Sequence, residues 1–227
     1  MEFVDWCDNA NAYFKVDVFY LHRPDSQTPI SETLSAVRDV YRCGMFRRFG
    51  LSGFPASEVE TIHHHCVELE GCPLPTVYQG SYNPLSRYKE TTLIPTLRKL
   101  SISLYAYGPS AGGFLAKTVA QAEEMARSDY STYISATCRP YVGNLRFLEA
   151  LARWNDIAYS EGVSGAELAY RWIAYHSALG RENGDALIVG TSSHEQLEET
   201  LTGIEKGPLS DAACAAVNDI WESVKNE

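Results

Sequence analysis

An α/β fold built on a parallel sheet is predicted by three features of the 227-residue sequence. Short apolar runs rich in β-branched and aromatic residues, each too brief for a helix, recur along the chain. A segment with helical periodicity follows each run, and the turn motifs that join antiparallel hairpins are almost absent. Strands that alternate with helices in this way pair in parallel through right-handed crossovers. We therefore expect a single α/β domain over residues 1–227 with about five parallel strands.

The first predicted strand begins at Val16 and stops at Pro24, whose ring nitrogen cannot donate a backbone hydrogen bond. The apolar spacing in residues 1–15 is typical of the end of a helix. His22 lies at the carboxyl end of the strand, where parallel sheets and barrels bind their ligands. His22 is therefore a candidate catalytic residue. The alternative is a structural histidine that is hydrogen-bonded within the fold.

The remaining elements follow from the same two periodicities. Ser57 with Glu60 forms a capping-box pattern at the second helix, and Ser164 is a predicted N-cap. The stretch between residues 127 and 144 is expected to be irregular. Further strands are predicted at 45–52, 76–79, 102–107 and 186–190, and helices at 29–43, 56–69, 91–100, 119–127, 145–161, 164–176, 193–206 and 210–225.

The composition excludes several classes of partner. The formal net charge of -10 argues against a nucleic acid, although helix N-termini can still bind the phosphates of a cofactor. No stretch reaches the roughly 20 apolar residues of a membrane helix, and no signal-peptide pattern is present, so we expect a cytoplasmic protein. The cysteines form no CxxC pair, and the adjacent histidines of residues 63–65 point in different directions on a helix. No metal site is therefore predicted.

Five segments together carry a family resemblance: DVFYLH at 17–22, GLS at 50–52, YQGSYN at 78–83, YGPSAGG at 107–113 and GTSSHEQLEE at 190–199. In this order they resemble the aldo-keto reductases, most closely the aflatoxin-aldehyde reductase branch. The resemblance implies a (β/α)₈ barrel of the TIM type with NADP(H) across the carboxyl ends of its strands. The strand at Val16 corresponds to the fourth strand of the family. We therefore expect an incomplete, N-terminally truncated barrel that lacks the first three βα units.

The resemblance also implies where the nicotinamide half of NADP(H) would bind. Ser52 and Gln79 would hydrogen-bond the carboxamide, and Tyr107 would stack on the ring. Lys117 and the preceding glycine-rich loop would run past the pyrophosphate. The Asn that follows Gly-Leu-Ser in the family is Gly53 here, which removes one expected contact.

At the adenosine half, the resemblance places Ser192 and Gln196 beside the 2′-phosphate and Glu199 beside the adenine amino group. The Asn that follows this glutamate in the family is Thr200 here. Together with the other departures, this substitution leads us to expect reduced or abolished affinity for NADP(H).

In the family, an Asp, a Tyr, a Lys and a His surround the reacting carbonyl group, and the tyrosine donates the proton. Of these four, only the histidine carries over, as His22. Loss of general acid catalysis costs roughly 10²–10⁴ in rate. Histidine titrates near neutral pH, so His22 is the expected replacement donor. The prediction is an enzyme that acts on a small carbonyl compound, with compromised NADP(H)-linked reduction and a role in fungal secondary metabolism.

Two alternatives stay open. The same pocket would serve a redox-independent acid–base enzyme, such as an isomerase, a dehydratase or a cyclase. The chain would otherwise be a non-catalytic module that binds the cofactor or regulates a partner. In each case an open barrel exposes strand edges and apolar faces, so we expect a homodimer that covers them.

Overall fold

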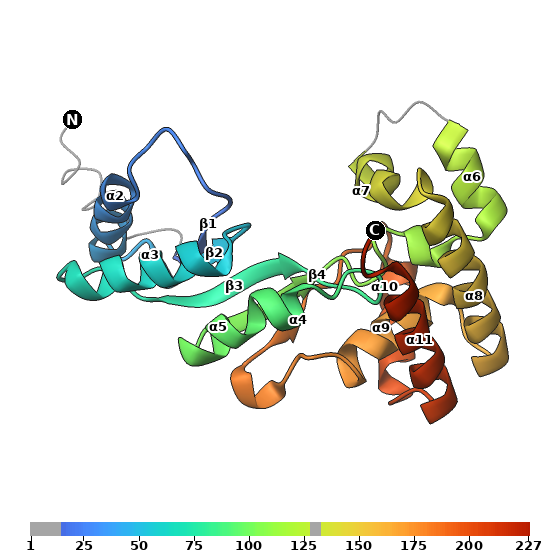
Figure 1. Ribbon diagram of the computed structural model, residues 1–227. Coiled ribbons are helices and arrows are strands. Elements are labelled where there is room, and N and C mark those ends of the chain that lie inside the picture. Colours follow the sequence, from blue (N-terminus) through green and yellow to red (C-terminus); the bar gives the residue numbers. More distant parts are fainter. Residues whose placement is uncertain (1–14, 128–132) are drawn as a thin grey trace. The chain divides into compact units, whose positions relative to one another are not determined.

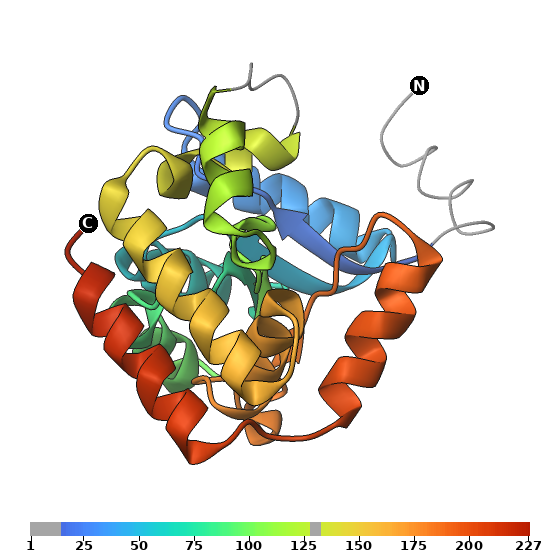
Figure 2. The same cartoon turned by 90° about the vertical axis from the view of Figure 1, so that its right-hand side faces the viewer.

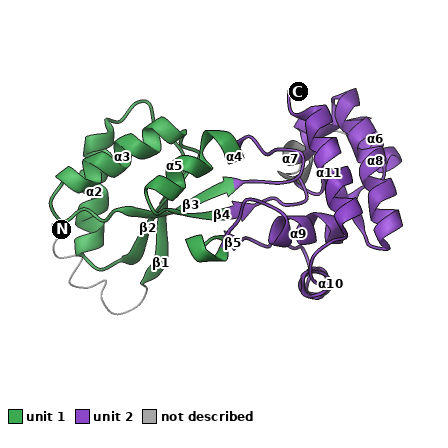
Figure 3. Cartoon of the chain, turned by 60° about the horizontal axis from the view of Figure 1, so that its bottom comes forward, with its two compact units in different colours: residues 1–80, 90–105, 181–185 green, residues 81–89, 106–180, 186–227 purple. Residues whose placement is uncertain are grey.

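The computed structural model describes residues 15–127 and 133–227, apart from the side chains of residues 133–137 (Figure 1). The helix predicted within residues 1–15 falls almost entirely outside these ranges. The chain divides into two compact units (Figure 3). The strand unit comprises residues 1–80, 90–105 and 181–185, and the helical unit comprises residues 81–89, 106–180 and 186–227. The single domain over residues 1–227 stays a prediction.

Five strands form one open sheet in sequential order. β1 pairs in parallel with β2, and β2 pairs in parallel with β3. The predicted fold class, an incomplete α/β barrel, is therefore confirmed. The last strand is shorter than the predicted 186–190, and the third is longer than the predicted 76–79. The strands are β1 Val16–Leu21, β2 Phe46–Ser52, β3 Pro75–Ser81, β4 Ser103–Tyr107 and β5 Ala186–Leu187.

In the strand unit, helices α2 and α3 pack against each other, and α3 packs against α5 (Figure 1). Their apolar faces and those of the strands form a core that includes Leu34, Phe49 and Ile62, each at most 1% exposed. Phe46 at the start of β2 stacks on Phe19 of β1, with ring centroids 5.0 Å apart. The helices are α2 Ile30–Arg42, α3 Ala56–Glu68 and α5 Ile94–Lys99, and the short α4 Lys89–Thr92 crosses from one unit to the other.

Two predictions for these helices are wrong. The N-cap of α3 is Pro55, and no side chain caps the helix, so Ser57 lies inside it and makes no capping box. Proline favours the first positions of a helix because its φ angle is already helical. The predicted helix at 91–100 is interrupted at Leu93, whose φ of -128° is not helical. Pro95 lies in the first turn of α5, where its missing N–H costs nothing.

The core of the helical unit surrounds Trp154 and Trp172, which are at most 1% exposed. Trp154 Nε1 donates to the carbonyl oxygens of Leu115 at 3.0 Å and Gly165 at 3.2 Å. Helices α8 and α11 lie side by side, as the gold and red ribbons of Figure 2 show. The helices are α6 Val119–Arg127, α7 Tyr133–Val142, α8 Leu145–Glu161, α9 Gly165–Tyr175, α10 His194–Glu205 and α11 Asp211–Val224, with 3₁₀ turns η1 Phe114–Ala116 here and η2 Arg181–Asn183 in the strand unit.

Helix α7 differs from the irregular segment predicted between residues 127 and 144. It contains Pro140, which weakens the helical signal in the sequence. Cys138 and Val142, four residues apart, are both buried, so one face of α7 packs into the core. By contrast, the predicted Ser164 cap is confirmed, because its hydroxyl accepts from the backbone N–H of Glu167 at 3.1 Å.

The partly buried imidazole of His176 predicts that the stability of the fold depends on pH. Its Nε2 accepts a hydrogen bond from the backbone N–H of Leu209 at 2.8 Å, which requires the neutral ring. Burial, and then the nearby Arg171, hold the pKa of His176 below its usual value. Stability from this group is therefore complete above the unfolded-state pKa of ~6.5 and is lost as the pH falls towards the lower folded-state pKa.

We expect the free energy of unfolding to decrease between pH 7.5 and pH 5.5, about one unit either side of that unfolded-state pKa. Urea denaturation followed by tryptophan fluorescence measures it. His176→Gln should flatten this slope, whereas His64→Gln, at an exposed position on α3, should leave it unchanged. An identical slope in His176→Gln and the parent chain would contradict the assignment.

Candidate functional site

Three predicted site residues lie at one edge of the sheet. In the register of the parallel strands, Leu21 pairs with Leu51 and Ser52 pairs with Gln79. His22 follows Leu21 directly, so it continues β1 at the level of Ser52. Carboxyl ends of adjacent parallel strands share an edge, and this edge is where α/β folds bind ligands.

The presence of a glycine at position 53, where the family pattern has an Asn, has a structural explanation. Its φ is +76°, a left-handed conformation that favours glycine. A Cβ atom there would lie 3.5 Å from the carbonyl oxygen of His22 and 3.6 Å from Cα of Arg23. The chain after β2 therefore passes close to the backbone at His22.

The His22 side chain is exposed, and within residues 15–127 and 133–227 it has neither a hydrogen bond nor an ion pair. Asp25, three residues further along the chain than His22, is engaged locally. Its carboxylate accepts from the backbone N–H of Gln27 at 2.9 Å and from Thr28 Oγ1 at 2.8 Å, and these bonds lower the pKa of Asp25. The described contacts therefore give His22 no structural role and leave its imidazole open to a ligand.

A further residue near this edge, not predicted from the sequence, is Tyr20 on β1, two residues before His22. Tyr20 pairs with Gly50, and a Cβ atom on Gly50 would lie 2.5 Å from Tyr20 Cδ1 and Cε1. The ring therefore extends over β2 at the one residue without a side chain. Burial raises the pKa of the Tyr20 hydroxyl, opposed by a side-chain hydrogen bond with Gln79. The signal in the sequence was the spacing of two residues from Tyr20 to His22, which places both on one face of a strand.

A second polar cluster lies lower on the same strands, where Val18 pairs with Arg48. Arg48 Nη2 donates to Asp17 Oδ2 at 2.6 Å, and Nη1 donates to the Tyr105 hydroxyl at 3.0 Å. These bonds raise the pKa of Arg48. Arg48 is four residues before Ser52, so the cluster stabilises strand pairing well below the edge that carries His22.

The other predicted cofactor residues belong to the helical unit. Tyr107 ends β4 and is 38% exposed, so its ring is open to a ligand. The loop after it contains three consecutive residues with positive φ, Ala111, Gly112 and Gly113. Lys117 follows η1, and its charge opposes the burial that raises the pKa of the Cys138 thiol.

The start of α10 holds the three residues predicted for the adenosine half. Ser193 is the N-cap, and its Oγ accepts from the backbone N–H of Gln196 at 3.2 Å. Gln196 Oε1 accepts from the backbone N–H of Ser192 at 3.0 Å, which ties the residue before the N-cap to the first turn of α10. Ser192 and Glu199 are exposed. The amide N–H₂ of Gln196 takes no part in the bond with Ser192 and remains a donor for the predicted contact with a phosphate oxygen.

Tyr78 on β3 and Tyr82 directly after this strand hydrogen-bond to backbone groups of other segments. Tyr78 is 2% exposed and donates its hydroxyl hydrogen to the carbonyl oxygen of Phe54 at 2.8 Å. Tyr82 is fully buried, and its hydroxyl accepts from the backbone N–H of Ala178 at 3.0 Å.

The part of the chain that the structure describes holds no group of three or more His, Cys, Asp or Glu side chains placed to bind a metal ion. His64 from the histidine run instead lies 3.3 Å from Glu68 on the exposed side of α3. No described helix is long and apolar enough to cross a membrane.

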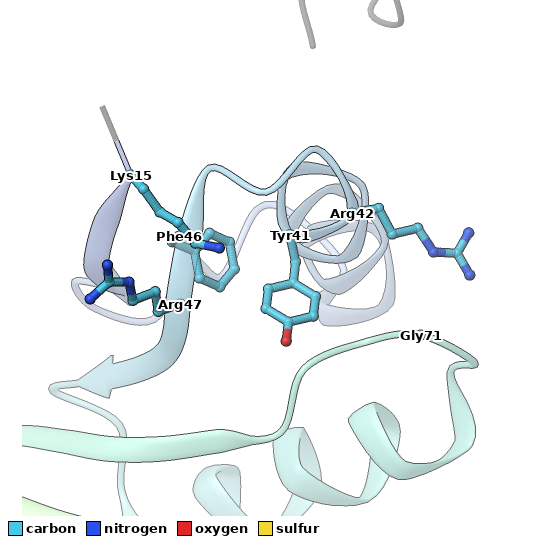
Figure 4. Close-up of a pocket in the computed structure, with 6 residues that line it drawn as sticks. All are labelled: Lys15, Tyr41, Arg42, Phe46, Arg47 and Gly71. Carbon is cyan, nitrogen blue, oxygen red and sulfur yellow. The ribbon is translucent and has the colours of Figure 1, made fainter. Parts of the chain in front are cut away.

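An open cavity of about 470 Å³ lies in the strand unit at the opposite end of the strands, where β1 and β2 begin (Figure 4). Lys15 and Phe46 mark those strand starts, so the cavity is separate from the edge that carries His22. None of the predicted site residues lines it. Its lining is basic and aromatic: Lys15, Tyr41, Arg42, Phe46, Arg47 and Gly71.

Comparison with known proteins gives consistent results. The profile of the aldo/keto reductase family matches residues 7–222. Oxidoreductase sirO of Leptosphaeria maculans is 38% identical over 214 residues, which cover 94% of this chain and 65% of that protein. An aldo-keto reductase of Pseudocercospora fijiensis is 39% identical, over 93% of this chain and 72% of its own length. Aflatoxin B1 aldehyde reductase member 2 of Rattus norvegicus is 38% identical, over 94% of this chain and 60% of its own length. The chain thus spans about two thirds of the length of these relatives.

Proposed function

Because the chain belongs to the aldo/keto reductase family, we propose that it is an enzyme that acts on the carbonyl group of a small molecule and uses NADP(H). The observation that carries this proposal is the strand register. It brings Ser52 level with Gln79 and places His22 at the same edge. The Ser52 hydroxyl and the Gln79 amide suit hydrogen bonds with the carboxamide of the cofactor. The imidazole of His22 suits a hydrogen bond to the carbonyl oxygen of a substrate.

Each of the two units, taken by itself, contains residues that suit one end of the cofactor. Ser52 and Gln79 are half-buried and present hydrogen-bonding groups for the carboxamide. The capped N-terminus of α10 suits an anionic phosphate, since its N–H groups and dipole attract negative charge. Ser52 and Gln79 would hold the nicotinamide, which would supply a hydride for the carbonyl carbon. His22 would donate a hydrogen bond to the carbonyl oxygen and supply its proton.

We propose that the affinity for NADP(H) is reduced, because Gly53 cannot supply the side-chain contact that the family pattern gives to the residue after Gly-Leu-Ser. A homodimer, a cytoplasmic location and a role in fungal secondary metabolism complete the proposal, and two of the relatives named above are fungal.

The test starts with NADPH binding by the purified 227-residue chain, followed by tryptophan quenching and nicotinamide fluorescence. Binding in the micromolar range, with oxidation of NADPH by aldehydes or ketones, is the expected result. His22→Ala should preserve binding and lower turnover by about 10²-fold, the effect of losing one acid–base group. His64→Ala, which removes an exposed histidine of α3, is the matched control and should change neither quantity.

The outcomes separate the alternatives. Binding without turnover on any carbonyl compound would favour a non-catalytic cofactor-binding module. No binding at millimolar NADPH would overturn the reductase and favour acid–base chemistry that needs no hydride. Equal turnover in His22→Ala and the parent chain would overturn the role of His22.

A further inference from the structure

Two cysteine thiols lie in contact at the end of α3, within the strand unit. Cys66 is on the last turns of α3 and is 2% exposed, whereas Cys72 is half-buried in the loop that leads to β3. Their sulfur atoms are 3.4 Å apart, and both thiols are free. The Cys72 sulfur also lies 4.0 Å from the carbonyl oxygen of Leu34 on α2, so the pair lies where α2, α3 and this loop meet.

The fold itself brings Cys72 back to Cys66. After α3 ends at an extended Leu69, a tight turn forms in which the backbone N–H of Cys72 donates to the Leu69 carbonyl at 2.9 Å. Gly71 in this turn has a φ of +77°, which an L residue adopts only with strain. A Cβ atom at Gly71 would also lie 2.6 Å from Nη2 of Arg42.

A side chain of helix α2 hydrogen-bonds to the backbone of this turn. Nη2 of Arg42 donates to the carbonyl oxygen of Glu70 at 3.1 Å, beside Gly71. The contact between Cys66 and Cys72 is therefore specified by a glycine turn, a backbone hydrogen bond and an arginine clamp. These are features of a defined site rather than of two cysteines that meet by chance.

We propose that Cys66 and Cys72 form a redox-active dithiol that a low-molecular-weight disulfide oxidises to an intramolecular disulfide bond. Such a bond requires the sulfur atoms to approach from 3.4 Å to roughly 2 Å. Cys72 can make most of this movement because it lies in a loop. The proposal does not depend on the reductase function.

The two thiols have different roles in the exchange. Burial raises the pKa of both, but the positive charge of Arg38 and a hydrogen bond with Cys66 oppose this effect at Cys72. Cys72 is also the more exposed of the two. It is therefore the thiol that attacks the small disulfide, and Cys66 is the thiol that resolves the intermediate. Because both pKa values are raised, little thiolate is present at neutral pH and the exchange is slow.

The reaction balances without any other oxidant. The Cys72 thiolate attacks one sulfur of the disulfide RSSR, forms a mixed disulfide and releases RS⁻. The Cys66 thiolate then attacks the Cys72 sulfur, forms the Cys66–Cys72 bond and releases the second RS⁻. The two protons from the cysteine thiols end on the two released thiolates. One RSSR is thus reduced to two RSH, while the protein dithiol is oxidised.

The test treats the purified, folded chain with glutathione disulfide, blocks the remaining thiols after acid quenching and maps the peptides by mass spectrometry. The expected product joins the peptides of Cys66 and Cys72, with the loss of two hydrogen atoms, and dithiothreitol reverses it. Cys138 and Cys214 are free thiols elsewhere in the described chain and serve as internal references that remain reduced. Cys214→Ser is the matched control and should leave the yield of the linked peptides unchanged.

Two variants test the order of events. Cys66→Ser should trap Cys72 as a stable mixed disulfide with glutathione, whereas Cys72→Ser should leave Cys66 as a thiol. The proposal is overturned if both thiols of the parent chain stay reduced, if each carries its own glutathione, or if either links to another cysteine. Mapping of the parent chain decides this even where a variant fails to fold, and a failure to bind NADPH has no bearing on it.

Discussion

Replacing Asp185 with Asn is expected to lower the free energy of unfolding by about 3–5 kcal/mol, the usual cost of breaking a buried ion pair from one side. The Asp185 side chain is 1% exposed, and its Oδ2 lies 2.5 Å from Nη2 of Arg98. Nη1 of Arg98 donates to Oδ1 at 2.9 Å, which makes the pair bidentate. Oδ1 also accepts from the backbone N–H of Leu104 at 2.7 Å.

The variant keeps the shape of the side chain but removes its charge, so Arg98 loses its buried counter-ion. The amide N–H₂ of the new Asn also faces a hydrogen-bond donor where a carboxylate oxygen accepted before. Urea denaturation at neutral pH, followed by circular dichroism, measures the loss. Glu60→Gln is the control. It breaks the exposed pair with Lys99, at 3.1 Å, and should cost less than about 1 kcal/mol. Equal effects of the two substitutions would show that burial does not set the contribution of Asp185.

Gly165→Ala should destabilise the helical unit by about 3 kcal/mol, at the upper end of the usual cost of overpacking. A Cβ atom on Gly165 would lie 2.2 Å from the carbonyl oxygen of Leu115 and 3.1 Å from Trp154 Nε1. The close neighbour is backbone and cannot turn aside, so η1 or α9 must move. Such movement also weakens the hydrogen bond from Trp154 Nε1 to Leu115, now 3.0 Å long.

Thermal and urea denaturation followed by tryptophan emission report this change, because Trp154 is adjacent to the substituted residue. Gly143→Ala is the matched control. Its Cβ atom would meet its nearest neighbour, the carbonyl oxygen of Arg139, at an ordinary 3.6 Å. We expect that control to stay within about 0.5 kcal/mol of the parent chain, as surface substitutions usually do. A stable Gly165→Ala variant with unchanged emission would show that η1 and α9 separate at little cost.

Part of the candidate site could be predicted from local sequence. Pro24 and the apolar run before it locate the end of β1, so the position of His22 at a strand end required no tertiary information. The position of Ser52 opposite Gln79 is different, since a register joins segments 27 residues apart. Only the packed sheet selects one register. For the same reason, the ring of Tyr20 over Gly50 had no local signal beyond the spacing along its own strand.

Local rules were least reliable where two signals competed at a helix terminus. At α3 the capping-box pattern of Ser57 competed with Pro55, and proline set the start of the helix. At α7 the internal Pro140 suggested irregular chain, although burial of Cys138 and Val142 stabilises a helix there. In each case a contact made in the folded chain outweighed the local preference.

The sequence by itself determined the alternation of strands and helices, the parallel sheet and the family, because periodicity and motif order are properties of neighbouring residues. Only the tertiary structure decided which distant groups meet. It placed Cys66 against Cys72 through a glycine turn clamped by Arg42, and it buried Asp185 against Arg98, 87 residues away in the chain. The physical reason is that such contacts depend on how helices and strands pack around a core. Packing is a cooperative property of the whole chain that no local pattern encodes.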